Sequence, residues 1–197
     1  MWTGIIILAI ILLFILWMIG IYNRLVTLRN QVKNAWSQID VQLQRRYDLI
    51  PNLVETVKGY MEFEKSTLQA VIAARNQAAT AREQLQKSEA PPSGSSMKEL
   101  MNAETALRGG VGQIFALAEN YPQLRASETM QRLQEELSAT ENKVAFSRQG
   151  YNDVVMLYNI AQQAFPAVFV AAPFGHQPAA LWELESQEAK KAVRISF

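Results

Sequence analysis

The feature that most constrains this chain is an N-terminal segment without a single charged side chain. Residues 1–23 read MWTGIIILAIILLFILWMIGIYN, and the run from Gly4 to Ile21 is almost entirely apolar. At about 1.5 Å per residue, a helix of this length crosses a hydrocarbon core of about 30 Å. Trp17 lies near its end, as aromatic rings do at membrane interfaces. A buried core helix is the alternative, but so long a run without a polar face favours lipid. We therefore expect a transmembrane anchor over residues 1–23 that includes Gly4, Trp17 and Ile21.

The flanking residues predict how this anchor is processed and oriented. No basic side chain precedes the apolar run and no small-residue cleavage site ends it, so we expect an uncleaved anchor. Arg24, Arg29 and Lys33 follow it before the first acid, Asp40. Because basic flanks tend to stay in the cytoplasm, we expect a single-pass protein of the cell inner membrane with its N-terminus outside and its C-terminal domain cytoplasmic. A periplasmic domain stays open.

The composition bounds the remaining part of the chain. About 175 residues are enough for one domain with a hydrophobic core. The formal net charge is +1, which argues against a nucleic-acid partner. There are no cysteines and only nine glycines and seven prolines, and strong helix formers dominate the stretches between them.

Hydrophobic periodicity predicts an all-α fold over residues 24–165. Residues 24–62 carry apolar side chains at steps of three or four, which is typical of one long helix with a buried stripe, and Pro51 predicts a kink in it. Further helices are expected over 62–88, 97–118 and 127–165, with a loop at 89–96. Together they predict a long antiparallel four-helix bundle, in which the first helix continues from the membrane span.

Two details of this pattern carry further expectations. Gly109, Gly110 and Gly112 weaken the third helix, so we expect a break or a close packing site there. After Phe165 the periodicity changes, and residues 166–197 are expected to form an extended tail. Alternating apolar side chains in this tail predict short strands that contact an adjacent protomer. These candidate oligomer contacts are Trp182, Leu184, Val193, Ile195 and Phe197.

A search for catalytic chemistry yields little. The usual hydrolase, metalloprotease and phosphate-loop motifs are absent. Glu135, Glu136 and Glu141 could gather around a metal, but a solvated helix face explains them better, and the lone His176 lies in a Pro/Gly-rich stretch. We therefore expect no enzymatic activity, no metal, no cofactor and no small-molecule substrate.

Polar residues on two of the predicted helices stand out from their surroundings. They could form a buried polar layer that fixes the register of the helices, or a recognition surface for a partner. They are Asp40, Arg46 and Asp48 on the first helix and Arg148, Tyr151, Asn152, Tyr158 and Asn159 on the last one.

Several motifs in this sequence resemble the LemA family. The pattern D-x-x-L-x-R-R-x-D-L-I-P-N-L at residues 40–53, ENYPQL at 119–124 and ENKVAFSRQGYNDVVMLYNIAQQAFPAVFVA at 141–171 carry the resemblance. It implies a single membrane span, a very short outer N-terminus and a cytoplasmic helical bundle. The family has no established enzymatic activity, so the resemblance does not define a function.

Three functions from different classes remain open. The first is a scaffold or adaptor that forms homo-oligomers and organises partner proteins at the membrane. The second is an accessory subunit of a membrane protease or of an envelope quality-control or stress complex. The third is a membrane-remodelling or lipid-binding protein that uses Phe165, Phe169 and Phe174. A hydrolase is the least supported class and would depend on Glu135 or His176.

Overall fold

The computed structural model describes residues 2–61, 64–87, 92 and 94–183, and every helix in this part of the chain is an α-helix apart from one short 3₁₀ turn. The helices are α1 (Trp2–Lys58), α2 (Lys65–Gln86), α3 (Gly94–Ala118), α4 (Pro122–Arg125), α5 (Glu128–Gln163) and α6 (Val168–Ala171). No strand occurs among these residues. The all-α expectation is therefore confirmed.

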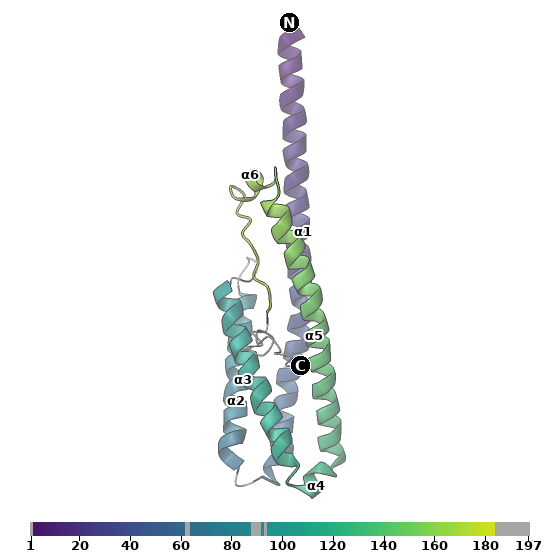
Figure 1. The fold of residues 1–197 in the computed structure, drawn as a ribbon, viewed down its shortest axis with the longest axis vertical. Helices are drawn as coiled ribbons and strands as arrows, with labels where there is room; N and C mark the ends of the chain where they lie inside the picture. Colours follow the sequence, from purple (N-terminus) through teal and green to yellow (C-terminus); the bar gives the residue numbers. More distant parts are fainter. Residues whose placement is uncertain (1, 62–63, 88–91, 93, 184–197) are drawn as a thin grey trace, which may run out of the picture.

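A single helix joins the apolar segment to the bundle. α1 has 57 residues, which corresponds to a length of about 85 Å. An apolar window near its N-terminus has a mean hydropathy of 3.1, and none of that window is buried, so it is long and apolar enough to cross a membrane. From Leu25 onward the same helix buries side chains on one face, and from Val32 to Val57 they recur at least every four residues. The apolar segment and the first helix of the bundle therefore form one continuous rod (Figure 1).

Pro51 does not end α1, contrary to what proline does to most helices. A proline removes the amide that would bond the carbonyl four residues earlier, here that of Tyr47. Nε of Arg75, on α2, donates a hydrogen bond of 3.2 Å to this carbonyl oxygen. The neighbouring helix thus satisfies the acceptor that Pro51 leaves without its usual partner.

This compensation predicts a coupling between Arg75 and Pro51. Arg75→Met is expected to lower the free energy of unfolding by about 1–2 kcal/mol, because the carbonyl of Tyr47 loses a charged donor. In a Pro51→Ala background the backbone amide of residue 51 is restored, and the cost of Arg75→Met should shrink. Urea unfolding of the four proteins in detergent measures this coupling. Equal costs in both backgrounds would contradict it.

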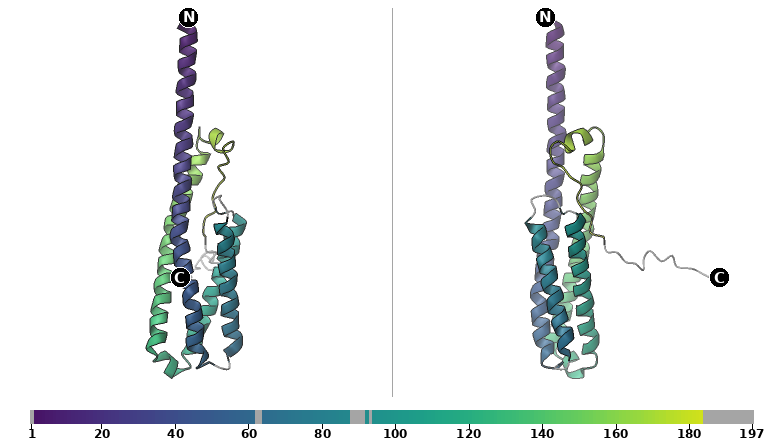
Figure 2. Two further views of the ribbon diagram at one scale, coloured as in Figure 1. Left: turned by 180° about the vertical axis from the view of Figure 1, so that it is seen from behind. Right: turned by 90° about the vertical axis from the view of Figure 1, so that its left-hand side faces the viewer.

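The helices form a bundle whose two ends differ. α2 has 22 residues and α3 has 25, so both are shorter than α5 with 36. They lie side by side against α1 and α5 at the end distant from the N-terminus (Figures 1 and 2). α5 runs antiparallel to α1 and extends further toward the membrane segment than α2 and α3 do. Near that end, residues 172–183 descend from α6 along α5 and take up space that the shorter helices leave. The expected bundle is present, but an extended segment completes its upper part.

The glycines of α3 produce a close contact and no break. α3 is continuous from Gly94 to Ala118. A Cβ atom at Gly110 would lie 2.9 Å from Cγ2 of Val71 on α2, whereas Cβ atoms at Gly109 and Gly112 would meet nothing within 4 Å. Of the two outcomes expected from the sequence, close packing is the one that occurs, and Gly110 alone is responsible for it. The same continuity excludes a phosphate-binding loop at these residues.

The expectation that the tail is extended from residue 166 onward is wrong for its first part, because Val168–Ala171 form the short helix α6. The described part of the tail contains no strand. Residues 176–183 are irregular, and the expected strand pattern at Val193, Ile195 and Phe197, like Leu184, lies outside the described residues. Trp182 is buried, with 3% of its surface exposed. Its ring lies 5.9 Å from that of Trp36 on α1, and its contact with an adjacent protomer stays a prediction.

Candidate functional site

The polar residues singled out from the sequence occupy three different environments. Asp48 is exposed, and its carboxylate accepts a hydrogen bond of 2.7 Å from the side chain of Gln44 on the same helix. Asp40 and Arg46 make contacts with α2 and α3. The residues from α5 instead surround the descending tail. They do not form one continuous layer.

Asp40 connects α1 to α2 through a two-pronged ion pair. Nε and Nη2 of Arg82 donate to its two carboxylate oxygens at 2.5 and 2.9 Å. Gln86 adds a third hydrogen bond at 2.6 Å. The bond to Asp40 is the main reason that the pKa of Arg82 is raised. Such fork-like pairing fixes both distance and rotation between two helices.

A buried polar cluster connects α1 to α3. Nη1 of Arg46 lies 3.3 Å from Oε2 of Glu104, and both side chains are almost fully buried. The hydroxyl of Tyr47 donates a short hydrogen bond to the other carboxylate oxygen. Burial raises the pKa of Glu104 even though Arg46 and Tyr47 favour its charged form. Burial, and then the charge of Glu104, raise the pKa of Tyr47, so the phenol remains a hydrogen-bond donor.

Two asparagines of α5 bind the backbone of the tail. The amide of Asn159 accepts from the N–H of Ala179 and donates to its carbonyl, both at 2.9 Å. Asn152 binds Trp182 in the same way, at 2.8 and 3.0 Å. Each asparagine therefore satisfies the donor and the acceptor of one tail residue, as a neighbouring strand would do.

The spacing of these contacts follows from helix and strand geometry. Asn152 and Asn159 are two helical turns apart, which is about 10.5 Å along α5. Ala179 and Trp182 are three residues apart, which is about 10 Å in extended chain. The helix thus presents its amides at the repeat that an extended segment requires. We call these two asparagines and the two tyrosines described next the α5 clamp.

The tyrosines of the α5 clamp contact the tail at neighbouring points. The hydroxyl of Tyr151 donates to the carbonyl of Ala180 at 2.8 Å. The hydroxyl of Tyr158 lies 3.1 Å from Nδ1 of His176. The ring of Tyr151 also packs against Trp36, with centroids 5.8 Å apart. Within one chain, these side chains therefore serve to seat the tail.

His176 makes the stability of the contact between the tail and α5 sensitive to pH. Burial, and then the positive charge of Arg29, lower its pKa below the ordinary value of about 6.5. The folded state therefore favours the neutral imidazole, and this contribution to stability is present above that value and is lost as the pH falls through the folded pKa.

We expect the wild-type chain to lose stability on acidification from pH 7 to pH 5 through this group. His176→Gln, which cannot take up a proton, should flatten the dependence over that interval. Thermal unfolding followed by tryptophan fluorescence at several pH values measures the effect. His176 is the one histidine of the chain, so no other imidazole confuses the comparison. An unchanged pH profile in the variant would contradict this role.

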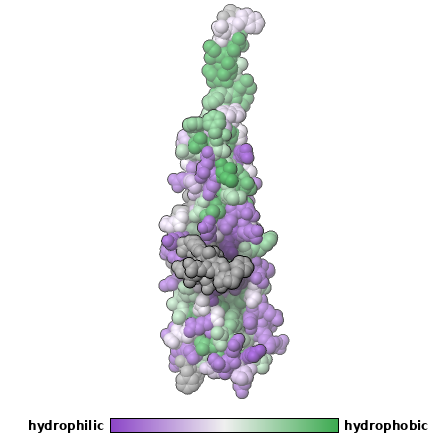
Figure 3. All heavy atoms as spheres, in the orientation of Figure 1, coloured by the Kyte–Doolittle hydropathy of each residue, from purple (hydrophilic) through white to green (hydrophobic). Residues whose placement is uncertain are grey.

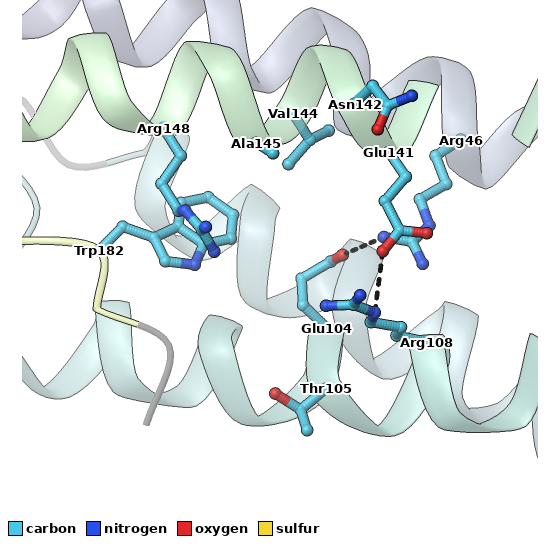
Figure 4. A pocket seen from close by; sticks show the side chains of 10 residues that line it. All are labelled: Arg46, Glu104, Thr105, Arg108, Glu141, Asn142, Val144, Ala145, Arg148 and Trp182. Carbon is cyan, nitrogen blue, oxygen red and sulfur yellow. Dashed lines mark hydrogen bonds and ion pairs between the residues drawn. The ribbon is translucent and has the colours of Figure 1, made fainter. Parts of the chain in front are cut away.

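A cleft of about 650 Å³ lies between α3, α5 and the end of the described tail (Figure 4). Arg108 and Glu141 form an ion pair of 2.8 Å at its rim, and the Arg46–Glu104 pair lies deeper. Arg148 and Trp182 both line the cleft near its other end. Burial, and then repulsion from Arg108, lower the pKa of Arg148. Among the described residues Arg148 has no hydrogen bond or ion pair, so the cleft presents a cation that an acidic group would neutralise.

Comparisons with known proteins place the chain in a family. A model of the LemA family matches residues 35–197. The chain belongs to the LemA family. The resemblance noted from the sequence motifs is therefore confirmed.

Individual relatives of this LemA-family chain are more distant. It is 26% identical to the magnetosome protein MamQ of Magnetospirillum gryphiswaldense over 163 residues, which cover 76% of this chain and 60% of the relative. It is 27% identical to protein LemA of Metamycoplasma hominis over 141 residues, which cover 72% of this chain and 59% of the relative. The chain thus spans about three fifths of the length of these curated relatives.

The sequence patterns of this LemA-family chain did not predict that Glu104 and Arg82 form ion pairs between helices. Glu104 was detectable, because it takes a place in a regular apolar stripe, where a carboxylate needs a partner. That stripe consists of Met97, Leu100, Glu104, Leu107, Val111, Ile114 and Ala118. Arg82 gave no such signal, since it lies among other polar residues and its role depends on where α2 meets α1.

The glutamates considered as metal ligands take part in other contacts or point to solvent. Glu141 pairs with Arg108, Glu136 lies 4.0 Å from Arg45, and Glu135 is exposed. Within the described ranges no three acidic or histidine side chains come together as a metal site would require. A metal at these residues is therefore not supported.

Proposed function

We propose that this protein is a membrane-anchored, non-enzymatic scaffold or adaptor that self-assembles and organises partner proteins at the bacterial inner membrane. The observation that carries this proposal is the continuity of α1, which begins in the apolar segment and ends in the core of the bundle. A continuous helix holds a bundle at a fixed distance from the membrane far better than a flexible linker does. A fixed platform is useful for positioning other proteins.

The chemistry of the described side chains supports the same proposal. The buried or half-buried polar groups of the Arg46–Glu104 pair, the Asp40–Arg82 pair and the α5 clamp contact one another or the tail. They stabilise one arrangement of helices and tail. The name of the relative MamQ assigns that protein to the magnetosome and states no reaction.

Arg148 and its surroundings are the part of the predicted recognition surface that best fits a partner. The side chain lines the cleft, and the exposed ring of Phe146 lies two residues away on α5. Arg148 and Phe146 both line a second, shallower depression on α5, and a cation and an aromatic ring in one depression suit an acidic, partly apolar peptide segment. We propose this region as the contact for a partner protein.

The basic residues after the apolar segment support a cytoplasmic bundle. Arg24, Arg29 and Lys33 follow the segment closely, and positive flanks favour the cytoplasmic side. Fusion of a reporter that is active on only one side of the membrane to Phe197 tests this orientation. Activity of the periplasmic reporter alone would place the bundle outside the cytoplasm.

The mass of the native complex tests the scaffold proposal. The full chain is extracted in mild detergent, its mass is measured, and co-purifying proteins are identified by mass spectrometry. A large assembly of this chain alone, or one with several partners, supports the scaffold. One partner at a fixed ratio would instead make the chain an accessory subunit, for example of a membrane protease. A monomer without partners would refute the proposal.

A further inference from the structure

The end of the bundle nearest the N-terminus carries a group of exposed apolar side chains outside α1. We call residues 164–174, which contain α6 and the turns on either side of it, the apolar tip. Phe165 is 82% exposed, Phe169 72% and Phe174 54%. Large rings exposed to this degree on adjacent turns are unfavourable in water and are typical of a surface that another phase or molecule covers.

The apolar tip lies at the level where α1 enters its apolar segment. Trp36 of α1 contacts Tyr151 of α5, with ring centroids 5.8 Å apart. Because the two helices are antiparallel and have the same rise, the end of α5 at Gln163 lies level with Arg24. The residues that follow Gln163 therefore lie at or beyond the boundary of the span.

Direct contacts between the tip and the span fix this level. The ring of Phe174 lies 5.1 Å from that of Tyr22. Phe174 and Tyr22 also line a small depression with Ile15, Met18 and Ile19. Ile15 is about 10 Å further along the helix than Tyr22. A bilayer that covers α1 up to Tyr22 therefore also reaches Phe174.

The distribution of charge agrees with this placement. Residues 154–182 contain no Asp, Glu, Lys or Arg, and residues 1–23 contain none either. The charges that lipid headgroups attract come from α1, where Arg24 and Lys33 are exposed just below the tip. In Figure 3 the apolar surface lies mainly over the upper part of the molecule, and hydrophilic surface is abundant over the lower bundle.

We propose that the apolar tip inserts into the same leaflet of the bilayer from which α1 emerges, with Phe165 and Phe169 among the acyl chains. The protein would then meet the membrane at two points. A single helix leaves a bundle free to rotate about its axis and to tilt, whereas a second insertion fixes both motions. The occupant of this surface is lipid, because the tip continues the apolar surface of the span. The inference rests on the span and does not depend on the scaffold role.

Labelling at single cysteines tests this insertion directly. The chain has no cysteine, so each substitution gives one labelled site. A fluorophore is attached at Phe169→Cys, and separately at Phe165→Cys as a second position in case one variant misfolds. The full chain is reconstituted in vesicles of phosphatidylcholine and phosphatidylglycerol. Quenching is measured with nitroxide-bearing acyl chains and with aqueous iodide.

Two further positions calibrate the result. Phe146→Cys is the matched control, because Phe146 is 80% exposed and lies on α5 far from the span. Leu12→Cys reports the hydrocarbon core. We expect labels at the tip to be quenched by acyl-chain nitroxides at a depth of about 5–10 Å and shielded from iodide. The label at residue 146 should behave in the opposite way.

Two outcomes would overturn the proposal. If tip labels are quenched by iodide as strongly as the label at residue 146, the tip lies in water. If they are shielded from both quenchers, protein covers the tip, either a second copy or another part of the chain. Either result refutes lipid insertion and leaves the membrane span itself untouched.

Discussion

Replacing Arg46 by methionine is expected to lower the free energy of unfolding by about 3 kcal/mol or more at pH 8. The substitution leaves the buried carboxylate of Glu104 with Tyr47 but without a cation, and uncompensated buried charges are costly. Chemical unfolding of the full chain in detergent measures the loss.

The cost of Arg46→Met should depend on pH in a defined direction. Burial already raises the pKa of Glu104 in the wild-type chain, and removal of Arg46 raises it further. A carboxyl with a raised pKa contributes its stability below the unfolded pKa, and this contribution is lost as the pH rises through the folded pKa. The variant should therefore approach the stability of the wild-type chain at pH 5 and fall behind it at pH 8.

Two further variants make this prediction specific. Adding Glu104→Gln to Arg46→Met removes the orphaned charge and should restore much of the stability at pH 8. Arg45→Met is the matched control, because Arg45 is exposed and lies 4.0 Å from Glu136, so its loss should cost less than about 1 kcal/mol. Equal losses at positions 45 and 46, or no rescue by Glu104→Gln, would show that the buried pair has no special role.

Replacing Trp182 by alanine is expected to cost about 3–5 kcal/mol. Only 3% of the surface of Trp182 is exposed. Its ring packs against that of Trp36 and thereby joins the tail to α1. Truncation leaves a cavity that the rigid α5 clamp cannot close. Thermal unfolding followed by near-ultraviolet circular dichroism detects the loss of this packing.

The Trp182→Ala variant also distinguishes two roles of the tail. If the tail is bound within its own chain, stability falls equally at all protein concentrations and the mass of the native complex is unchanged. If Trp182 contacts an adjacent protomer, as expected from the sequence, the variant loses mass and its stability depends on concentration. Phe146→Ala, at an exposed ring on α5, is the control and should change stability by less than about 0.5 kcal/mol.

The strong local patterns of the sequence predicted most of the helices. The uncharged residues 1–23 and the apolar stripe after Leu25 were sufficient to predict one rod from the membrane segment into the bundle, and α1 confirms it. The Pro/Ser/Gly-rich segment separates α2 from α3, but α3 begins at Gly94, inside the loop expected over residues 89–96. The short helix α4, which begins at Pro122, was not predicted. Periodicity predicts the long helices because each depends only on residues close together in the chain.

Contacts between residues far apart in the chain could not be predicted from local sequence patterns. The kink expected at Pro51 stays a prediction, and no sequence pattern indicated that Arg75 from α2 satisfies the carbonyl that Pro51 leaves without a donor. Alternating apolar residues in the tail predicted strands. In the described part of the tail, Asn152 and Asn159 instead bind the backbone of Trp182 and Ala179, as a partner strand would. In both cases the deciding hydrogen bonds join residues twenty or more positions apart, which no local pattern encodes.

The sequence by itself therefore determined most of the helices, the candidate span and the family, since periodicity, apolar length and motif are all properties of neighbouring residues. Only the tertiary structure decided how the polar residues are used. An asparagine on a helix surface looks the same in sequence whether it meets water, a partner or the tail, because the free energy of a polar side chain depends on what lies opposite it. For Asn152 and Asn159 that neighbour is the extended segment from Ala179 to Trp182, which the fold returns along α5.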